Sequence, residues 1–283
     1  MNLYKKGNDL VLGISVEDIN VVDTVDCGQC FRFTKTSDNE ITGVAHGRIL
    51  SLTQTQTDII FHDTTEDEFH QIWCNYFDLD TDYSSLKAML SKDNTLKKAL
   101  GYAGGIRIVR QDSFEALLSF IISQNNNIPR IKASINKLCK KFGKNIIGDI
   151  YAFPSVDALS NLSKEDFSDI GLGYRDDYII DCVCKIKNGE INLENIKEMS
   201  IEDARAALRT IKGIGPKVAE CALLFGFYRV EAFPIDTWIK KALKYYYPDG
   251  FPIEFQNCAG IAQQYIFHYI RTCKDAVPDE LKK

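Results

Sequence analysis

The chain of 283 residues is predicted to be an α+β protein, in which an N-terminal antiparallel β-sheet domain precedes a mostly helical body. Short apolar runs alternate over residues 1–105 and are separated by turn residues such as Asn39 and Gly47, which is typical of an antiparallel sheet. From Asp112 onward the apolar spacing is almost wholly helical. At about 203–228 two apolar helical runs flank a Gly-x-Gly turn, which predicts a helix-hairpin-helix motif within the body.

The N-terminal domain is expected to contain about five strands. Their expected positions are residues 10–16, 30–33, 41–45, 48–53 and 58–61. Helical periodicity begins near Glu66, continues through Leu79, and returns between Leu86 and Leu100. We therefore divide the chain into a sheet domain with flanking helices, residues 1–105, and a helical body, residues 106–283.

Composition places the chain among ordinary globular proteins, with 45% hydrophobic and 26% charged residues. No apolar stretch is long enough to cross a membrane, and the N-terminus has no apolar signal segment. We therefore expect a cytoplasmic protein without a membrane partner, and we expect a monomer.

The net charge of −5 at first argues against a nucleic-acid partner. The distribution of charge is uneven, however, because residues 125–144 contain no acidic residue. The basic residues in that segment are Arg130, Lys132, Lys137, Lys140, Lys141 and Lys144, and Lys240, Lys241 and Lys244 form a second group. One basic face for DNA and an ordinary solvated helix surface are both consistent with this pattern.

The nine cysteines are scattered and odd in number, which argues against a disulfide framework. Cys27 and Cys30 form a C-x-x-C pair, but no second pair follows at zinc-finger spacing. The C-terminal region also lacks a clustered run of four cysteines, so a [4Fe–4S] cluster is not expected. We expect no metal site formed by side chains, and mostly buried thiols.

The predicted hairpin carries the residues from which the functional interpretation starts. Gly213 and Gly215 allow unusual backbone angles and close approach of another backbone, and Pro216 suits the first turn of a helix. Backbone amides at such a helix start bind phosphate without regard to sequence. Lys217 falls in the first turn, where the helix dipole favours its neutral amine, and a neutral lysine amine is a nucleophile that forms Schiff bases.

Asp236 precedes the next apolar-periodic run and is expected to cap a helix. A lysine and an aspartate that each begin a helix are suited to face one cleft. Considered singly, Gly-x-Gly turns and capping aspartates are usually structural. The combination of hairpin, Lys217 and Asp236 favours a catalytic pair.

This stretch resembles the helix-hairpin-helix DNA glycosylases, and most closely the 8-oxoguanine DNA glycosylase/AP lyase family. In that family the lysine after the hairpin is the nucleophile and the later aspartate is its partner, and Lys217 and Asp236 stand in those positions. The resemblance extends through four further motifs in the same order, from Gly28 to Phe267.

Two of these motifs imply a pocket for the damaged base. The sequence D-C-G-Q-C-F-R is similar to the family's G-Q-x-F-R turn, in which the carbonyl of the glycine, here Gly28, accepts the N7–H of 8-oxoguanine. Guanine lacks that hydrogen, so the buried carbonyl would disfavour it by roughly 1–3 kcal/mol. The segment A-G-I-A-Q-Q-Y-I-F implies that Gln263 reads the Watson–Crick edge and that Phe267 packs on the base, opposite Cys221. A strand-end turn and an ordinary amphipathic helix are the structural alternatives.

The other two motifs imply contacts around the extruded base. The segment S-Q-N-N-N-I-P-R-I is similar to the family's S-x-N-N-N-I-x-R-I, in which Asn125 and Arg130 would read the cytosine left behind. In G-L-G-Y-R, the resemblance implies that Tyr174 wedges into the stack and that Arg175 contacts the cytosine. An aromatic ring in the vacated space offsets the cost of base extrusion. A capped helix and a packed turn are the structural alternatives.

The resemblance implies a bifunctional DNA repair enzyme, a DNA N-glycosylase with AP lyase activity. It would excise 8-oxoguanine from double-stranded DNA, preferably opposite cytosine, through a lysine Schiff base, and then nick the strand by β-elimination. No cofactor is required, although the hairpin carbonyls are a candidate site for a structural cation. Trp238 and Ile270 replace the family's usual histidine and acid, and Pro129 and Phe225 also depart from its pattern, so phosphate contacts and pocket shape are expected to differ.

Two other functions are consistent with the sequence. One is a related helix-hairpin-helix glycosylase for another damaged or mispaired base, against which Gly28 and Gln263 argue together. The other is a non-catalytic DNA-binding module, because hairpins of this kind often only grip phosphates. Borohydride trapping of a covalent complex separates this last function from an enzyme.

Overall fold

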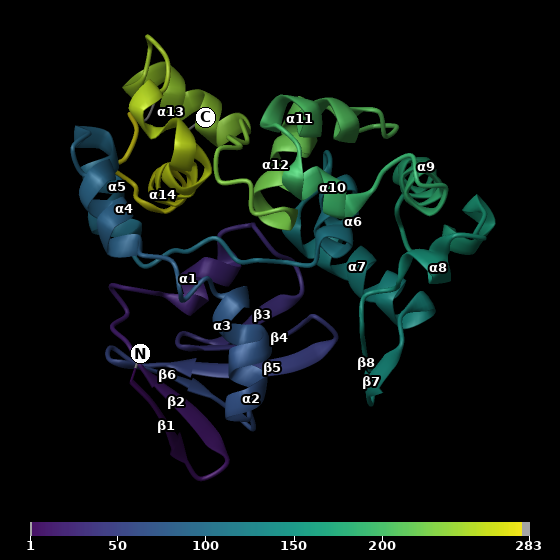
Figure 1. Cartoon of the computed structure of the whole chain (residues 1–283), viewed down its shortest axis with the longest axis horizontal. Helices are drawn as coiled ribbons and strands as arrows, with labels where there is room; N and C mark the ends of the chain where they lie inside the picture. The colour runs from purple at the N-terminus through teal and green to yellow at the C-terminus, as the bar shows by residue number, and fades with distance from the viewer. Residues whose placement is uncertain (1, 279–283) are drawn as a thin grey trace.

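A sheet domain and a larger helical body make up the chain (Figure 1). The structure is a computed structural model that describes residues 2–278. Each part has its own buried core, one over the sheet and one inside the body. The α+β class predicted from the sequence is therefore confirmed.

Six antiparallel strands form the N-terminal sheet, in the spatial order β1-β2-β6-β5-β4-β3. They are β1 (Asn2–Lys6), β2 (Asp9–Gly13), β3 (Phe33–Ser37), β4 (Glu40–Ala45), β5 (Arg48–Gln54) and β6 (Asp58–Phe61). The sequence does not predict β1, because this edge strand is mostly polar and exposed. The strand expected at residues 30–33 is wrong in its bounds, because a turn occupies most of that stretch and β3 begins at Phe33.

One face of the sheet is covered by helical segments. These are α1 (Val21–Asp26) and the continuous run of α2 (Glu66–Glu68), a π-helical turn (Phe69–Trp73) and α3 (Cys74–Tyr76). The ring of Phe69 meets that of Phe61 edge-on at 5.1 Å in the sheet core. Gln54 ties α1 to the sheet, because its side chain accepts from the Val21 amide at 2.8 Å and donates to the Ile19 carbonyl at 2.6 Å. The start of α1 is thus fixed, and the Gly28 turn follows directly after it.

The body is built around α6, which is apolar on all sides and therefore buried at most of its positions. Its larger helices are α4 (Tyr83–Leu90), α5 (Asn94–Ala103), α6 (Ser113–Ser123), α7 (Ile128–Phe142), α9 (Arg175–Lys187), α11 (Ile201–Arg209), α12 (Pro216–Gly226), α13 (Thr237–Tyr246) and α14 (Ala259–Thr272). Shorter elements are β7 (Asn145–Ile147), β8 (Ile150–Tyr151), α8 (Val156–Leu159), α10 (Leu193–Glu198) and two 3-10 turns, Lys164–Phe167 and Ile253–Cys258.

Helix α5 lies beside α14 and α4 packs on α5, and both belong to the core of the body, although they precede residue 106 in the chain (Figure 1). Leu90, Leu96 and Ala99 are buried there. The division of the chain near residue 105 stays a prediction, whereas in space the body recruits these two helices.

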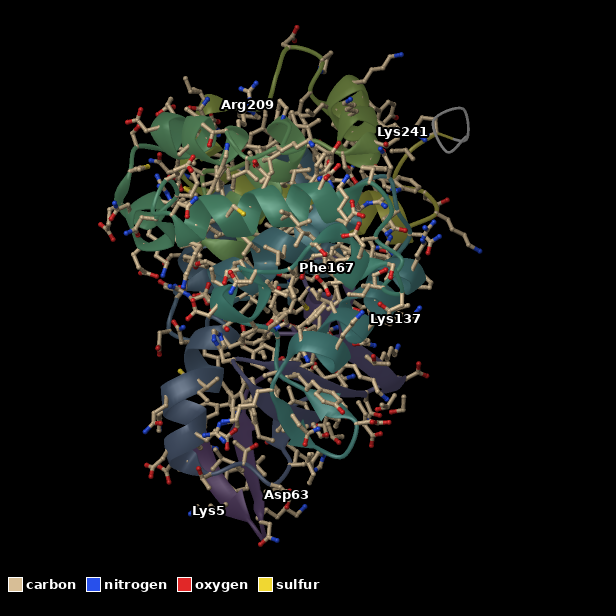
Figure 2. The ribbon with its side chains drawn as sticks, turned by 90° about the vertical axis from the view of Figure 1, so that its right-hand side faces the viewer. Lys5, Asp63, Lys137, Phe167, Arg209 and Lys241 are labelled. Atoms are coloured by element: carbon tan, nitrogen blue, oxygen red, sulfur yellow. The ribbon has the colours of Figure 1, made fainter. Side chains whose placement is uncertain are left out.

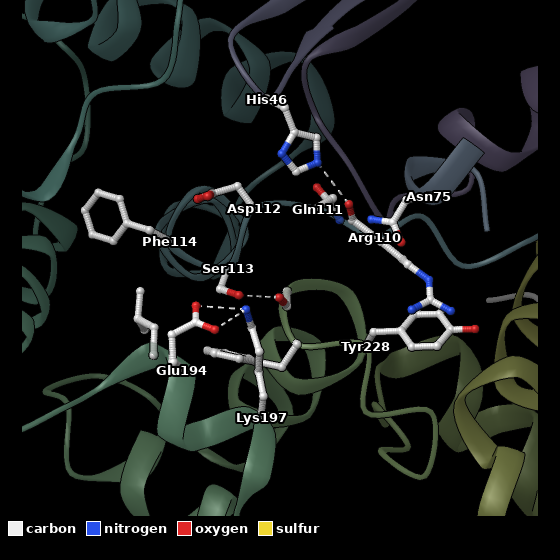
Figure 3. A pocket seen from close by; sticks show the side chains of 13 residues that line it. His46, Asn75, Arg110, Gln111, Asp112, Ser113, Phe114, Glu194, Lys197 and Tyr228 are labelled. Atoms are coloured by element: carbon white, nitrogen blue, oxygen red, sulfur yellow. Dashed lines mark hydrogen bonds and ion pairs between the residues drawn. The ribbon is translucent and has the colours of Figure 1, made fainter. Parts of the chain in front are cut away.

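A charge cluster around the buried Asp78 joins the end of α3 to the end of α12, and Figure 3 shows two of its members, Arg110 and Tyr228. Arg110 donates to the Asp78 carboxylate at 2.7 and 2.9 Å, and its guanidinium lies 3.6 Å from the centre of the Tyr228 ring. The Tyr228 hydroxyl donates to the other oxygen of Asp78 at 2.5 Å. A cavity of about 380 Å³ lies beside this cluster, and its walls contain none of the site residues predicted from the sequence.

All nine cysteines are free thiols, and seven of them are buried, as the sequence predicts. Between residues 2 and 278, no helix has the length and apolar character needed to cross a bilayer.

Candidate active site

The predicted helix-hairpin-helix motif is formed by α11 and α12. Gly215 is the residue before α12 and Pro216 is its first residue. Gly213 has a φ of +80°, and a Cβ atom there would lie 2.2 Å from the Tyr178 ring, so both the backbone angle and the packing require glycine. Open space surrounds the position that a Cβ of Gly215 would take. No side chain caps α12, so its first amides are available to an anion.

The hairpin is braced against α9. The Lys212 amide donates to the Asp181 carboxylate at 2.7 Å, and the Lys185 ammonium donates to the Thr210 carbonyl at 2.5 Å. These contacts hold the turn before any DNA is bound, which reduces the ordering that binding requires.

Lys217 and Asp236 lie around one buried thiol, that of Cys221. Lys217 is exposed in the first turn of α12, and the Asp236 side chain caps α13 by accepting from the Ile239 amide at 2.8 Å, as predicted. Burial raises the pKa of Cys221 to about 11, while the Lys217 ammonium lowers it and the Asp236 carboxylate raises it. The charges of Lys217 and Asp236 therefore both affect the Cys221 thiol.

The Gly28 turn is held by Gln29, a residue of the D-C-G-Q-C-F-R motif to which no role was assigned from the sequence. Gln29 is fully buried, and its Nε2 donates to the Thr24 carbonyl at 2.7 Å and the Arg107 carbonyl at 2.8 Å. Its Oε1 accepts from the Val109 amide at 2.8 Å. Gly28 itself has a φ of +83°, which favours glycine.

α14 supplies the other two residues predicted for the base pocket. Gln263 is 3% exposed, and its Nε2 donates to the Pro234 carbonyl at 3.1 Å, two residues before Asp236. Phe267 is half-buried one turn later, with the Arg271 guanidinium 5.7 Å from its ring centre. Helix α14 and the loop that carries Asp236 are therefore in direct contact.

The segment predicted to read the opposite strand lies at the surface. Asn125 has a φ of +45° and donates from Nδ2 to the Tyr174 hydroxyl at 3.3 Å. Tyr174 is 48% exposed, and Arg130 is exposed at the start of α7. The structure thus brings the proposed wedge and the proposed cytosine reader together.

Arg175 lies beneath this surface and is only 5% exposed. Its guanidinium donates to the Gln124 and Leu172 carbonyls at 2.9 Å and to the Asn125 carbonyl at 3.2 Å. These bonds hold the asparagine loop against the turn before α9. Contact of Arg175 with the cytosine stays a prediction, and its observed partners are backbone carbonyls.

The residues that depart from the family pattern have structural neighbours of their own. Trp238 is half-buried, and the Lys241 ammonium lies 5.2 Å from its ring. Ile270 is buried in the core of the body, and Phe225 stacks on Phe120 at 5.3 Å. Pro129 is exposed in the first turn of α7.

The basic face considered for α7 is only partly neutralised, because two of its lysines pair with carboxylates and two others donate to backbone carbonyls, which carry no charge. Four of its lysines are bonded to acceptors on neighbouring segments: Lys132 to the Phe33 carbonyl, Lys137 to the Asp169 carbonyl, Lys140 to the Asp149 carboxylate and Lys141 to the Asp169 carboxylate. Figure 2 places Lys137 near the sheet and Lys241 at the far end of the body, so the lysines of α7 and α13 are well separated.

Comparisons with known proteins agree with this geometry. Residues 11–117 match the family described as 8-oxoguanine DNA glycosylase, N-terminal domain, and residues 118–250 match the HhH-GPD superfamily of base excision DNA repair proteins. One similar solved structure is the crystal structure of Clostridium acetobutylicum 8-oxoguanine glycosylase/lyase in complex with DNA containing cytosine opposite 8-oxoguanine. That protein is 38% identical in sequence to this chain. Its TM-score is 0.87, over 96% of this chain and 98% of that one. This chain belongs to the 8-oxoguanine DNA glycosylase family.

Other members of the 8-oxoguanine DNA glycosylase family are similar over most of the chain. The structure of MBOgg1 with a low-affinity DNA ligand is 39% identical, with a TM-score of 0.87 over 95% of this chain and 98% of that one. The N-glycosylase/DNA lyase OGG1 of Arabidopsis thaliana is 32% identical over 242 residues, which are 80% of this chain and 66% of the plant protein. The family resemblance inferred from the sequence is confirmed, and the chain is a DNA repair enzyme of the base excision class.

Proposed function

We propose that this protein excises 8-oxoguanine from duplex DNA, preferably opposite cytosine, and then nicks the strand. The observation that carries the proposal is the uncapped start of α12, whose first turn holds Lys217, together with the Gln263–Pro234 bond that joins α14 to the loop before Asp236. The relatives named N-glycosylase/DNA lyase and 8-oxoguanine glycosylase/lyase support the same activity.

Catalysis would begin with a phosphate bound at the amides that follow Gly215. Tyr174 fills the space of the extruded nucleotide. The Lys217 amine then forms a bond to C1′ of the sugar as the bond from C1′ to N9 of the base breaks, and the departing base takes up a proton. The Asp236 carboxylate stabilises the positive charge that develops on the sugar.

Strand cleavage follows from the same covalent intermediate. Once the sugar ring opens, the Lys217 amine and C1′ form a Schiff base. The Schiff base acidifies the protons on C2′, so loss of one of them expels the 3′ phosphate by β-elimination. Hydrolysis of the Schiff base returns the free amine.

Recognition would use the base pocket and the opposite-strand segment separately. The Gly28 carbonyl accepts the N7–H that distinguishes 8-oxoguanine from guanine, and Gln263 and Phe267 hold its edge and face. Asn125 and Arg130 would bond to the cytosine that remains in the helix.

Borohydride trapping tests the covalent step. Reduction of the Schiff base should join the protein permanently to 8-oxoguanine duplex DNA, and Lys217→Gln should bind the duplex but give neither trapping nor base release. Loss of the nucleophile should lower the excision rate on the order of a thousandfold or more. Lys97→Gln, on the exposed face of α5, is the matched control and should behave as the wild type. Normal turnover by Lys217→Gln would contradict the proposal.

Substrate choice is tested with a panel of duplexes in which 8-oxoguanine faces each of the four bases and in which an alkylated purine replaces it. Fastest release of 8-oxoguanine opposite cytosine is expected. Faster release of the alkylated base would favour a related glycosylase of the same fold, and DNA binding without any release would favour a binding module.

Three further points belong to the proposal. The hairpin carbonyls would hold a structural cation, since backbone carbonyls are ligands of hard cations. Among residues 2–278 no cluster of three or more acidic, histidine or cysteine side chains offers another site. A loss of DNA affinity is expected either after chelation of divalent cations or after replacement of monovalent ones by a bulky organic cation, and unchanged affinity in both experiments would contradict the cation. We also propose a monomer, to be tested by light scattering, and a cytoplasmic location, which the buried free thiols support.

A further inference from the structure

Gln264 lies at the centre of a buried hydrogen-bond chain that the mechanism above does not use. It is 4% exposed, and its Nε2 donates to Oε1 of Gln263 at 2.7 Å. The Cys27 thiol donates to Oε1 of Gln264 at 3.3 Å, and Nε2 of Gln263 donates to the Pro234 carbonyl at 3.1 Å. This series of hydrogen bonds therefore runs from Cys27, the residue before Gly28, through Gln264 and Gln263 to the loop before Asp236.

The two ends of this chain determine which way the Gln263 amide points. The Pro234 carbonyl can only accept, so the nitrogen of Gln263 must face it and the oxygen must face Gln264. At the other end, burial raises the pKa of Cys27 to about 12, so its thiol keeps its proton at neutral pH. The Thr24 carbonyl, at 3.1 Å, competes for that proton, which makes the Pro234 end the firmer anchor.

Rotating the Gln263 amide by half a turn would break both of its bonds. Its oxygen would then face the Pro234 carbonyl, and its nitrogen would face the nitrogen of Gln264. Both mismatches would be buried, and buried polar groups without a partner are strongly disfavoured. Gln264 and the Pro234 carbonyl therefore together remove a freedom that a glutamine amide ordinarily has.

The orientation of the Gln263 amide matters because guanine-type and adenine-type bases present opposite hydrogen-bond donors and acceptors at ring positions 6 and 1. A guanine-type edge has an acceptor at position 6 and a donor at position 1, whereas an adenine-type edge has a donor at position 6 and an acceptor at position 1. One N–H and one lone pair of the Gln263 amide are not used by its bonds to Pro234 and Gln264. An amide that cannot rotate matches only one of the two purine edges.

We propose that Gln264 is a positioning residue that locks the amide of Gln263 and so restricts the pocket to oxopurine edges. This inference rests on the proposed function, because it assumes that Gln263 meets the excised base. Selectivity of this kind arises because a complex with an adenine-type base would leave buried polar groups unpaired. It does not require additional hydrogen bonds to the oxopurine.

The test compares 8-oxoguanine with 8-oxoadenine, each opposite cytosine, in single-turnover excision. Both bases carry the N7–H that the Gly28 carbonyl would accept, so they differ only at the edge that Gln263 would read. In Gln264→Met the side chain keeps its length but can no longer donate to Gln263. The ratio of the two excision rates should fall roughly tenfold, in keeping with the loss of one buried hydrogen bond.

Two further variants define the result. Gln264→Leu also removes the donor to Gln263, with a different apolar side chain, so it should lower the ratio in the same direction. Tyr265→Phe is the matched control, because the Tyr265 hydroxyl is buried in the same helix and has no hydrogen-bond partner within residues 2–278. It should leave the ratio unchanged.

Cleavage of DNA with a ready-made abasic site gives the readout that separates positioning from folding. No base is present there, so Gln264→Met should cleave it within twofold of the wild-type rate. An unchanged ratio in both Gln264 variants would overturn the inference, and so would equal losses of excision and abasic-site cleavage in both. Failure of the wild type to excise 8-oxoguanine at all would instead overturn the proposed function.

Discussion

At the scale of single residues, Arg175 shows how a buried charge shapes an exposed recognition loop. Its guanidinium donates to three carbonyls, those of Gln124, Asn125 and Leu172. Asn125 has a φ of +45°, which few residue types other than glycine tolerate, and carbonyls held from below stabilise that conformation. The side chain of Asn125 is then directed toward Tyr174.

We predict that Arg175→Lys lowers the free energy of unfolding by about 2–4 kcal/mol, because one ammonium cannot span three carbonyls and hydrogen bonds to buried charges are strong. Urea denaturation followed by circular dichroism measures the change. Tyr174→Phe is the control, since it loses a single bond from Asn125 and should cost about 1 kcal/mol or less. Equal losses in the two variants would argue against the bracing role of Arg175.

At the scale of elements, α9 couples the hairpin to the wedge. The Tyr178 ring fills the space beside Gly213 and lies 5.5 Å from the ring of Tyr174, which immediately precedes α9. The phosphate-binding turn and the residue proposed to enter the DNA stack are therefore held by the same helix. Their separation is set before DNA arrives, which favours simultaneous contact with a phosphate and a vacated base position.

Gly213→Ala and Gly215→Ala should separate the packing of the hairpin from its contact with DNA. At Gly213 the added methyl group meets the Tyr178 ring and the backbone angle is unfavourable, so we expect a loss of about 1–3 kcal/mol in stability together with weaker DNA binding. At Gly215 open space accepts the methyl group, so stability should hold while affinity falls. Urea denaturation and fluorescence anisotropy with duplex DNA measure the two effects. A Gly213→Ala protein of unchanged stability would contradict the packing argument.

At the scale of the whole molecule, the sequence predicts where helices begin better than it predicts contacts between residues that are distant in the chain. Pro216 and Asp236 mark helix starts, and the structure places both there. The contact between Cys27 and Gln264 spans 237 residues, and no local periodicity can indicate it. The same holds for Lys132, whose partner is the Phe33 carbonyl of the sheet, 99 residues away in the sequence.

The junction of the two domains contains a second long-range pair, Arg32 of the sheet domain and Glu115 of α6. Their nearest charged atoms are 3.8 Å apart, and Nη1 of Arg32 is buried without a hydrogen-bond partner among residues 2–278. Burial raises the pKa of Glu115 to about 7, and this effect outweighs the opposing attraction of the Arg32 charge. A carboxylate that would be charged in the unfolded chain is therefore held partly protonated at neutral pH.

This shift makes the stability of the domain junction dependent on pH. The folded protein binds the Glu115 proton more tightly than the unfolded chain does, so the stabilisation is complete below about pH 4.5 and is lost as the pH rises through about 7.

Glu115→Gln removes this dependence of stability on pH. Relative to the wild type, its free energy of unfolding should rise by up to about 3 kcal/mol between pH 5 and pH 8. The slope carries the prediction, because any interaction that the substitution removes adds the same offset at every pH. Urea denaturation across this range measures it, with Glu66→Gln on the exposed surface of α2 as the baseline. A difference between Glu115→Gln and the wild type that stays constant with pH would show that the buried carboxyl is already charged throughout.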